Sequence, residues 1–414
     1  MDLAISILSI MGRVFIETLS SPLFVCIYAV FFFIVAWQYK KMENLSEQIF
    51  GARQDQYLKS ALVSSIMGLL GGILGSCLLV FLGIDLTGVG IGHLWLIAIL
   101  LMLINPRFLC FAYAGGILAL FKLITGVPNI DIPQLMGLIA VLHMIESGLI
   151  LFNGHYSPTP VSVQKDHLVR GGFNLQKFWP IPLVALVSVG FAAEPGSGVA
   201  MPDWWPLLRG YSDFVEGKTY TMLPVMAILG YGEITTTSPP RERVKKSALH
   251  LFLYSLGLLF LAVASSQNNS LILLTALFSP VGHELIIWMG MREEVNKKPI
   301  YIKPDRGVKI LNVIKGSPAY RAGIRPDDIV IGINGMSTDD SHFLQVLLSN
   351  LQGSVNIEVK RDKTQLHLKA MNAPIKEFGI IPVPEHSAGQ YLSLGEDKLY
   401  SFASRLWRKI KQYF

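Results

Sequence analysis

The sequence predicts an all-α polytopic membrane domain of about seven to nine helices, followed by a small α/β domain and a C-terminal amphipathic helix. Of the 414 residues, 51% are hydrophobic and only 15% are charged, whereas roughly a quarter of the residues of a soluble globular protein are charged. Apolar runs dominate the first two thirds of the chain, and a mixed-charge sequence follows. This shift places the membrane domain at 1–290, the α/β domain at 299–372, a polar linker at 383–395 and the final helix at 396–414.

Nine apolar runs are candidates for membrane-spanning helices, each of which needs roughly 20 apolar residues. They are Thr18–Trp37, Ser60–Leu82, Gly88–Ile104, Phe108–Thr125, Gln134–Phe152, Pro180–Ala193, Tyr220–Ile234, Ala248–Ser265 and Leu271–Trp288. The sixth and seventh runs are the weakest, so seven helices are the alternative. Basic residues such as Lys40, Arg107 and Arg241 gather in alternate connections. The positive-inside rule places these connections and the C-terminal third in the cytoplasm.

Charge and cysteine usage exclude several other classes of protein. The net charge of +6 comes largely from basic residues beside the apolar runs, so membrane lipids rather than nucleic acid are the expected contact. The three cysteines, Cys26, Cys77 and Cys110, all fall inside apolar runs. We therefore expect neither a disulfide framework nor a cysteine zinc site, and no cofactor or metal.

A stripe of small residues marks the second apolar run. Gly68 and Gly72 are four residues apart, as are Gly71 and Gly75, a spacing that lets helices approach closely. Packing within one chain is favoured over a homo-oligomer, which stays the alternative.

Four ionisable residues inside the apolar runs are candidates for a polar function, because charge is costly in a membrane. His143 and Glu146 share one helical face and could meet. His283 and Glu284 resemble the start of the H-E-x-x-H motif of zinc proteases, but the position of the second histidine is occupied by Ile287. A structural polar contact is favoured, and no catalytic residue is assigned.

A long motif marks the α/β domain. The run Gly316–Gly335 reads GSPAYRAGIRPDDIVIGING and resembles PDZ domains, most of all the circularly permuted type found in bacterial membrane and periplasmic proteases. The resemblance implies a small barrel that binds peptides, often C-terminal ones, by adding a strand to a sheet edge. Use of the domain as rigid packing alone is the alternative.

The position of the peptide groove follows by analogy with PDZ domains. The residues expected to line it are Pro299, Ile300, Tyr301 and Ile302 on the edge strand and Phe343, Leu344 and Leu347 on helix Ser341–Leu351. The expected carboxylate-binding loop has no glycine, so internal peptides or a folded partner are alternatives to free C-termini. Phe378-Gly379-Ile380 resembles such a loop, but it follows the last predicted strand.

The end of the chain predicts a basic amphipathic helix. Leu399, Phe402 and Leu406 fall on one face, with Arg405 and Arg408 on its flanks. Such a helix suits an anionic cytoplasmic leaflet. Packing as a cap on the PDZ domain or on another chain is the alternative.

Four stretches outside the PDZ domain, together with that domain, resemble a single protein family. Asn105–Phe111, Gly171–Leu183, Gly230–Ile234 and Gly282–Glu284 are similar to the MinJ family, topological determinants of cell division in rod-shaped Gram-positive bacteria. The resemblance implies a non-enzymatic adaptor of the Min system in the cell membrane, enriched at septum and poles. Its expected partners are DivIVA-like and MinD-like proteins. An intramembrane site-2-type metalloprotease, or a degenerate relative, is the alternative, and a transporter using His143 and Glu146 comes third.

Overall fold

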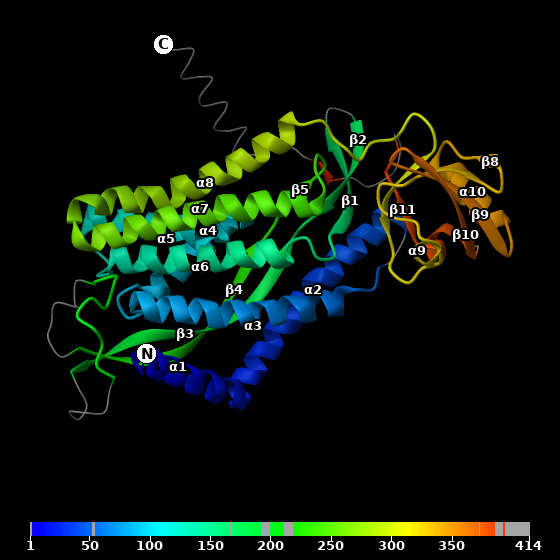
Figure 1. Cartoon of the computed structure of the whole chain (residues 1–414). Coiled ribbons are helices and arrows are strands. Elements are labelled where there is room, and N and C mark those ends of the chain that lie inside the picture. The colour runs from blue at the N-terminus through cyan, green and yellow to red at the C-terminus, as the bar shows by residue number, and fades with distance from the viewer. Residues whose placement is uncertain are drawn as a thin grey trace, which may run out of the picture.

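A computed structural model describes residues 2–51, 54–165, 168–191, 199–210, 218–371, 373–385 and 392–393. Most helices of the first two thirds of the chain run alongside one another, with the first helix at an angle to them (Figure 1). The domain with the PDZ-like motif (the PDZ domain) sits at one end of these helices. We call this end of the bundle the PDZ end and the opposite one the distal end. The predicted final helix, 396–414, lies outside the described residues.

Apolar helices build most of the membrane domain. They are α1 (Asp2–Ser20), α2 (Pro22–Phe50), α3 (Tyr57–Leu82), α4 (Ile91–Ile104), α5 (Phe111–Thr125), α6 (Ile132–Asn153), α7 (Pro240–Gln267) and α8 (Ile272–Asn296), with the 3-10 turns η1 (Pro106–Leu109) and η3 (Asn269–Leu271). Within the described ranges, five helical segments are long and apolar enough to cross a membrane: α2, α3, α6, α7 and η3–α8. Prolines stand in the first turns of α2, α6 and α7, and left-handed glycines end α2, α3 and α5, as helix termini favour.

Two of the predicted membrane helices are strands, which corrects the all-α expectation. The runs Pro180–Ala193 and Tyr220–Ile234 fall largely in β3 (Lys177–Phe191) and β4 (Lys218–Tyr231), which pair antiparallel as a long ribbon. Prolines interrupt both runs, and each is shorter than a helical span requires. As a strand, the same length reaches about 45–50 Å.

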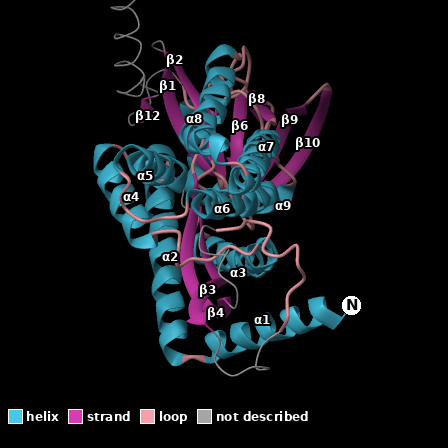
Figure 2. Ribbon diagram, turned by 90° about the vertical axis from the view of Figure 1, so that its left-hand side faces the viewer, coloured by secondary structure: helices cyan, strands magenta, loops and turns pink. Residues whose placement is uncertain are grey.

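The ribbon lies against α3 because that helix presents small residues to it (Figure 2). A Cβ atom added at Gly68 or Gly72 would collide with the carbonyl oxygen of Pro180 or Pro182, respectively. Four residues of helix advance about 6 Å and two residues of strand about 6.6 Å, so the two stripes stay in register. The predicted close contact of the glycine stripe is therefore made within one chain, to a strand.

The outer edge of β3 is covered along its length. Pro180 and Pro182 have no N–H to satisfy on this edge. The bonds along the rest of the edge run from Phe178 N–H to Tyr39 Oη (3.2 Å), Val184 N–H to Ser76 Oγ (2.7 Å), Leu86 N–H to Leu186 O (2.9 Å) and Ser188 N–H to Asp85 Oδ1 (3.1 Å). At these positions the edge is bonded by the protein itself, which suits a strand among apolar helices.

Helices α4 and α5 form a hairpin that enters and leaves the bundle at the distal end. The residues before α4 and α6 meet there, where Asp131 N–H donates to Gly88 O (2.7 Å). Both helices are about 21–23 Å long, too short to cross a bilayer. Arg107, at the tip, pairs with Glu284, about 18 Å before the end of α8. Arg107 was expected in a cytoplasmic loop and is instead inside the bundle.

A small sheet closes the PDZ end of the bundle. Its strand order is β12 (Leu392–Ser393), β1 (Thr159–Lys165), β2 (Leu168–Asn174) and β5 (Ile234–Thr235). Part of the predicted polar linker thus adds a parallel strand to β1.

The PDZ domain contains the strands and the long helix predicted from its motif. In chain order it comprises β6 (Val308–Val313), α9 (Pro318–Ala322), β7 (Ile329–Ile333), β8 (Met336–Ser337), α10 (Ser341–Asn350), β9 (Ser354–Arg361), β10 (Thr364–Met371), α11 (Ile375–Phe378) and β11 (Ile380–Pro382). The sheet order is β10-β9-β7-β6-β11, with β8 beside β7. The sheet therefore continues past the predicted boundary at 372, because β11 pairs with β6. Asp328, 1% exposed, accepts two hydrogen bonds from Arg361 inside the turn before β7.

Replacing Gly72 with alanine tests the fit of α3 to β3. The added methyl group would meet the Pro182 carbonyl oxygen, so Gly72→Ala should destabilise the membrane domain by about 1–3 kcal/mol. The measurement is the thermal unfolding midpoint of the purified chain in detergent. Gly148→Ala in α6 is the matched control, since nothing lies within 4 Å of its Cβ position. Equal midpoints for the two variants would contradict the fit.

Candidate functional site

Tyr301 fastens the PDZ domain to the membrane domain. Its side chain is 2% exposed, and its ring meets that of Phe173 on β2 edge to face, with centroids 5.3 Å apart. Gly171 N–H donates to the Tyr301 carbonyl oxygen (2.8 Å). Leu311 and Ile381 of the PDZ domain join the same apolar cluster. Burial raises the pKa of Tyr301. We call Phe173, Tyr301, Leu311 and Ile381 the docking seam.

The docking seam corrects the predicted position of the peptide groove. Pro299–Ile302 is not a strand, and Ile300 N–H donates to Thr236 O (3.0 Å) in the membrane domain. These apolar residues were assigned to a peptide edge because the sequence does not show that the bundle supplies their partner. On the opposite wall, Leu344 and Leu347 lie in the PDZ core, 0% and 8% exposed.

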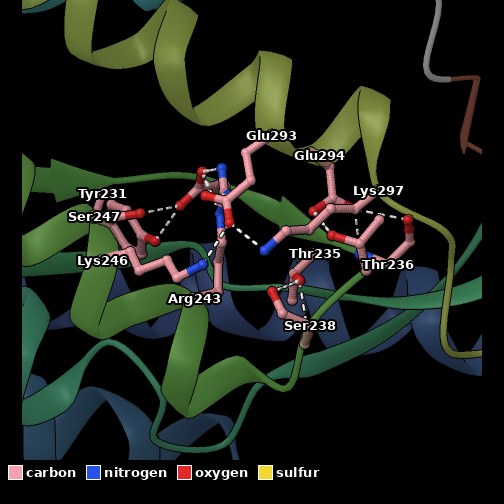
Figure 3. A network of polar contacts seen from close by, with 12 residues as sticks. Tyr231, Thr235, Thr236, Ser238, Arg243, Lys246, Ser247, Glu293, Glu294 and Lys297 are labelled. Carbon is pink, nitrogen blue, oxygen red and sulfur yellow. Dashed lines mark hydrogen bonds and ion pairs between the residues drawn. The ribbon is translucent and has the colours of Figure 1, made fainter.

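The segment that leads into the PDZ domain starts from a polar network (Figure 3). Glu294, near the end of α8, accepts hydrogen bonds from Thr236 N–H (2.6 Å), Thr236 Oγ1 (2.7 Å) and Thr237 Oγ1 (2.7 Å). Beside it, Arg243 pairs with Glu233 and lies 3.5 Å from Glu293. The network holds the end of α8 against the start of α7, so the following linker leaves in a fixed direction.

The strand edge beside α10 belongs to β11, at the end of the PDZ sheet. Ser341 N–H, at the start of α10, donates to Glu385 Oε1 (3.0 Å) just after β11, so the start of the helix lies next to the end of this strand. Phe343 and Val346, 41% and 39% exposed, are apolar side chains on adjacent turns of α10. Of the predicted groove residues on the helix, Phe343 is the one that is exposed.

Phe378 and Gly379 belong to the segment before β11, whose sequence resembles a PDZ carboxylate-binding loop. Phe378 N–H donates to Pro374 O (2.8 Å), and Gly379 N–H donates to Ile375 O (3.2 Å). Two of the amides that such a loop would offer to a peptide carboxylate are thus used inside α11. Gly379 has φ +83°, a conformation that favours glycine.

The four polar residues predicted inside the apolar runs lie on α6 and α8, and the side chain of Glu284 is 38% exposed. The predicted contact between His143 and Glu146 is not made. Glu284 instead pairs with Arg107 at the hairpin tip and accepts a hydrogen bond from Tyr113 Oη (2.6 Å). This half-buried ion pair joins the hairpin tip to α8.

His143 and His283 meet a residue that the sequence analysis set aside. The two rings are 5.2 Å apart between centroids, and Nε2 of each faces the Sγ atom of Cys110 at 3.1 Å and 3.6 Å. The other nitrogen of His143 lies 2.8 Å from Ile139 O, which leaves none for Glu146. The break Asn105-Pro106 before Cys110 is the local signal that this cysteine sits at a helix start rather than within a span.

Replacing Tyr301 with alanine should loosen the PDZ domain from the bundle without unfolding either part. Removing a buried aromatic side chain costs about 3–5 kcal/mol of stability. Here the loss would fall on the contact between the PDZ domain and the bundle. The measurement is the rate of limited proteolysis at Lys297–Lys303, which should rise at least tenfold. The control is Ile302→Ala, because the neighbouring Ile302 is 48% exposed. Unchanged cleavage in Tyr301→Ala would show that the seam does not hold the domain.

Comparisons with known proteins agree with the resemblance noted in the sequence. Residues 309–361 match the PDZ domain family. The chain is 23% identical over 233 residues to the cell division topological determinant MinJ of Bacillus subtilis (strain 168), which covers 55% of each protein. It is 26% identical over 266 residues to a probable MinJ of Lacticaseibacillus paracasei, 61% of this chain and 66% of the relative. The matches thus span between about half and two thirds of the length of these relatives.

A shorter similarity points to a protease. A probable periplasmic serine endoprotease DegP-like of Hahella chejuensis (strain KCTC 2396) is 28% identical over 111 residues, 25% of this chain and 23% of the relative. The relatives matched over more than half of the chain are named as topological determinants, not as enzymes. The apolar helices fit a multi-pass membrane protein. The chain is therefore similar to MinJ cell division determinants over more than half of its length and carries a PDZ domain, as its sequence predicted.

Proposed function

We propose that this chain is a non-enzymatic membrane adaptor of division-site selection, which holds its PDZ domain at the cytoplasmic face and recruits division proteins there. The observation that carries the proposal is the docking seam, which joins the PDZ domain to a bundle that resembles MinJ. Tyr301 on the linker and Leu311 and Ile381 of the domain are each at most 2% exposed. A domain held in this way presents its free surfaces in a fixed orientation.

The recruiting surface in this proposal is the free edge of β11 together with the exposed apolar side chains of α10. A sheet edge invites strand addition, and Phe343 with Val346 supplies apolar contact beside it. Because Phe378 N–H and Gly379 N–H are already bonded within α11, the favoured ligand is an internal segment of a folded partner rather than a free C-terminus. By resemblance, DivIVA-like and MinD-like proteins are the partners to test.

The alternative function, an intramembrane metalloprotease, has weaker support. It rests on the short DegP-like similarity and on His283 with Glu284. In a protease the glutamate would act as general base, but here Glu284 is engaged by Arg107 and Tyr113. A base needs a free carboxylate facing the metal and the substrate, so this arrangement favours the adaptor.

Placing a charge on α10 tests the recruiting surface. Phe343→Glu puts a carboxylate on an exposed apolar position, which should weaken capture of a MinD-like partner by about tenfold, or ~1.4 kcal/mol. The measurement is recovery of the partner with the full-length chain from detergent-solubilised membranes, together with septal enrichment of the fluorescent chain. Met336→Glu is the matched control, because Met336 is equally exposed (41%) but lies on β8. Full capture by a folded Phe343→Glu variant would remove α10 from the surface.

A reporter that is active only in the cytoplasm tests the orientation. Basic residues such as Lys41 and Lys246 lie toward the PDZ end of their helices, so a fusion after Phe414 should be active. A fusion that ends at Asp131, in the distal connection before α6, should be inactive. The opposite pattern would place the PDZ domain outside the cell and end the proposed role.

A further inference from the structure

Three side chains that commonly bind transition metals converge inside the bundle from three separate segments. Cys110 is the N-cap residue of α5, His143 lies near the middle of α6, and His283 lies in α8. One ligand atom from each lies within 4.8 Å of the other two. No two of these residues are close in sequence, so the cluster exists only because the hairpin tip reaches between α6 and α8.

The spacing of these atoms matches ligands around a single ion. Zinc binds a cysteine sulfur at about 2.3 Å and a histidine nitrogen at about 2.0 Å, so a tetrahedral angle puts sulfur and nitrogen about 3.5 Å apart. Cys110 Sγ is 3.1 Å from His143 Nε2 and 3.6 Å from His283 Nε2. Both sulfur–nitrogen distances are therefore within about 0.4 Å of the zinc geometry, and all three ligand atoms lie within 4.8 Å of one another.

The surroundings of His143 orient it as a metal ligand. Its Nδ1 lies 2.8 Å from Ile139 O, so Nδ1 carries the proton and donates it to the carbonyl oxygen. In a neutral imidazole the other nitrogen, Nε2, then has its lone pair free, and this lone pair faces Cys110. A backbone carbonyl is one of the usual partners for the far nitrogen of a histidine that binds a metal.

The ring of His283 is held by aromatic contacts. Tyr113 and Tyr254 meet it edge to face, with centroids 5.3 Å and 5.5 Å away. Its Nδ1 is buried and has no hydrogen-bond partner among the described residues, so Nε2 makes its one polar contact there, with Cys110. A buried nitrogen without a hydrogen-bond partner costs free energy. The fixed position of this ring therefore suggests a function.

Cys110 lies at the start of a helix, beside a backbone donor. Its Sγ accepts a hydrogen bond from Ala112 N–H (3.4 Å) at the start of α5, where the helix dipole favours negative charge. The neighbouring ion pair between Arg107 and Glu284 fixes the hairpin tip to α8. Cys110 is therefore held beside His283 by a contact that does not itself involve the cluster.

We propose that Cys110, His143 and His283 bind one late first-row transition-metal ion, with Zn²⁺ the best fit to one thiolate and two imidazoles. On binding, the S–H bond of Cys110 breaks, its proton leaves to solvent, and a sulfur–metal bond forms with no change of oxidation state. The fourth position stays open to water. The ion ties the α4–α5 hairpin to α6 and α8. The site goes beyond the adaptor role and does not depend on it.

Metal content of the full-length chain tests the site. The chain is purified in detergent without a polyhistidine tag, incubated with Zn²⁺, freed of loose metal by gel filtration and measured by mass spectrometry. We expect about one zinc per chain in the wild type and less than about a tenth of that in Cys110→Ser and His283→Gln. Cys77→Ser and His93→Gln are matched controls outside the cluster and should keep the wild-type content.

A spectroscopic measurement on the wild type keeps the proposal testable even where a variant fails to fold. Co²⁺ loaded in place of zinc should give the intense absorption of a cobalt–thiolate bond, and added Zn²⁺ should remove it. If the wild-type chain bound no zinc and showed no such absorption, the cluster would be only a hydrogen-bonded thiol. That result would overturn the proposal. Wild-type zinc content in a folded Cys110→Ser variant would overturn it equally.

Discussion

The contact between the outer edge of β3 and the small-residue face of α3 is the constraint on which the rest of the membrane domain depends. A strand among membrane helices exposes backbone donors and acceptors that lipid cannot satisfy. Pro180 and Pro182 remove two donors, and the glycines of α3 let the two carbonyl groups approach the helix backbone. Ser76 then bonds Val184 N–H. Without this match, the ribbon could not lie so close to α3.

The same ribbon determines where the PDZ domain sits. β3 follows β2 after two residues, and β4 leads into β5 after two more, so the ribbon and the sheet at the PDZ end are one continuous structure. Phe173 of β2 receives Tyr301, while Thr236, just after β5, bonds both Glu294 and Ile300. The end of α8 and the linker after it are thereby fixed to the ribbon, and the PDZ domain follows the membrane domain as a unit.

The hairpin α4–α5 shows how one ion pair can bring distant groups together. Arg107 and Glu284 are separated by 177 positions, and their contact puts the hairpin tip beside α8. Cys110 follows the tip by one turn and so meets His283, while α6 contributes His143 from the other side. The unusual chemistry of the interior thus depends on a hairpin that stops partway through the bundle.

The sequence by itself determined the class of protein. Composition indicated a membrane domain, and the motif from Gly316 to Gly335 indicated a PDZ domain. The motif could be read from the sequence because its residues form turns and helix caps with close neighbours in the chain. Its resemblance to MinJ also lay in the sequence, and the comparisons agree with it. The strands and the helix of the PDZ domain were predictable for the same reason, apart from β11, which comes after the apparent end of the motif.

Only the tertiary structure decided the ribbon, the docking seam and the buried cluster. Strands that face a helix on one side and other apolar surroundings on the other show no polar alternation, so β3 and β4 resembled short helices in composition. Tyr301 and Leu344 are apolar groups suited to a groove or to a core, and only their partners, Phe173 and the PDZ interior, separate these two uses. Cys110 and the two histidines come from segments far apart in the chain. Spacing along the sequence records neighbours within one element, whereas these contacts join different elements, and folding alone brings them together.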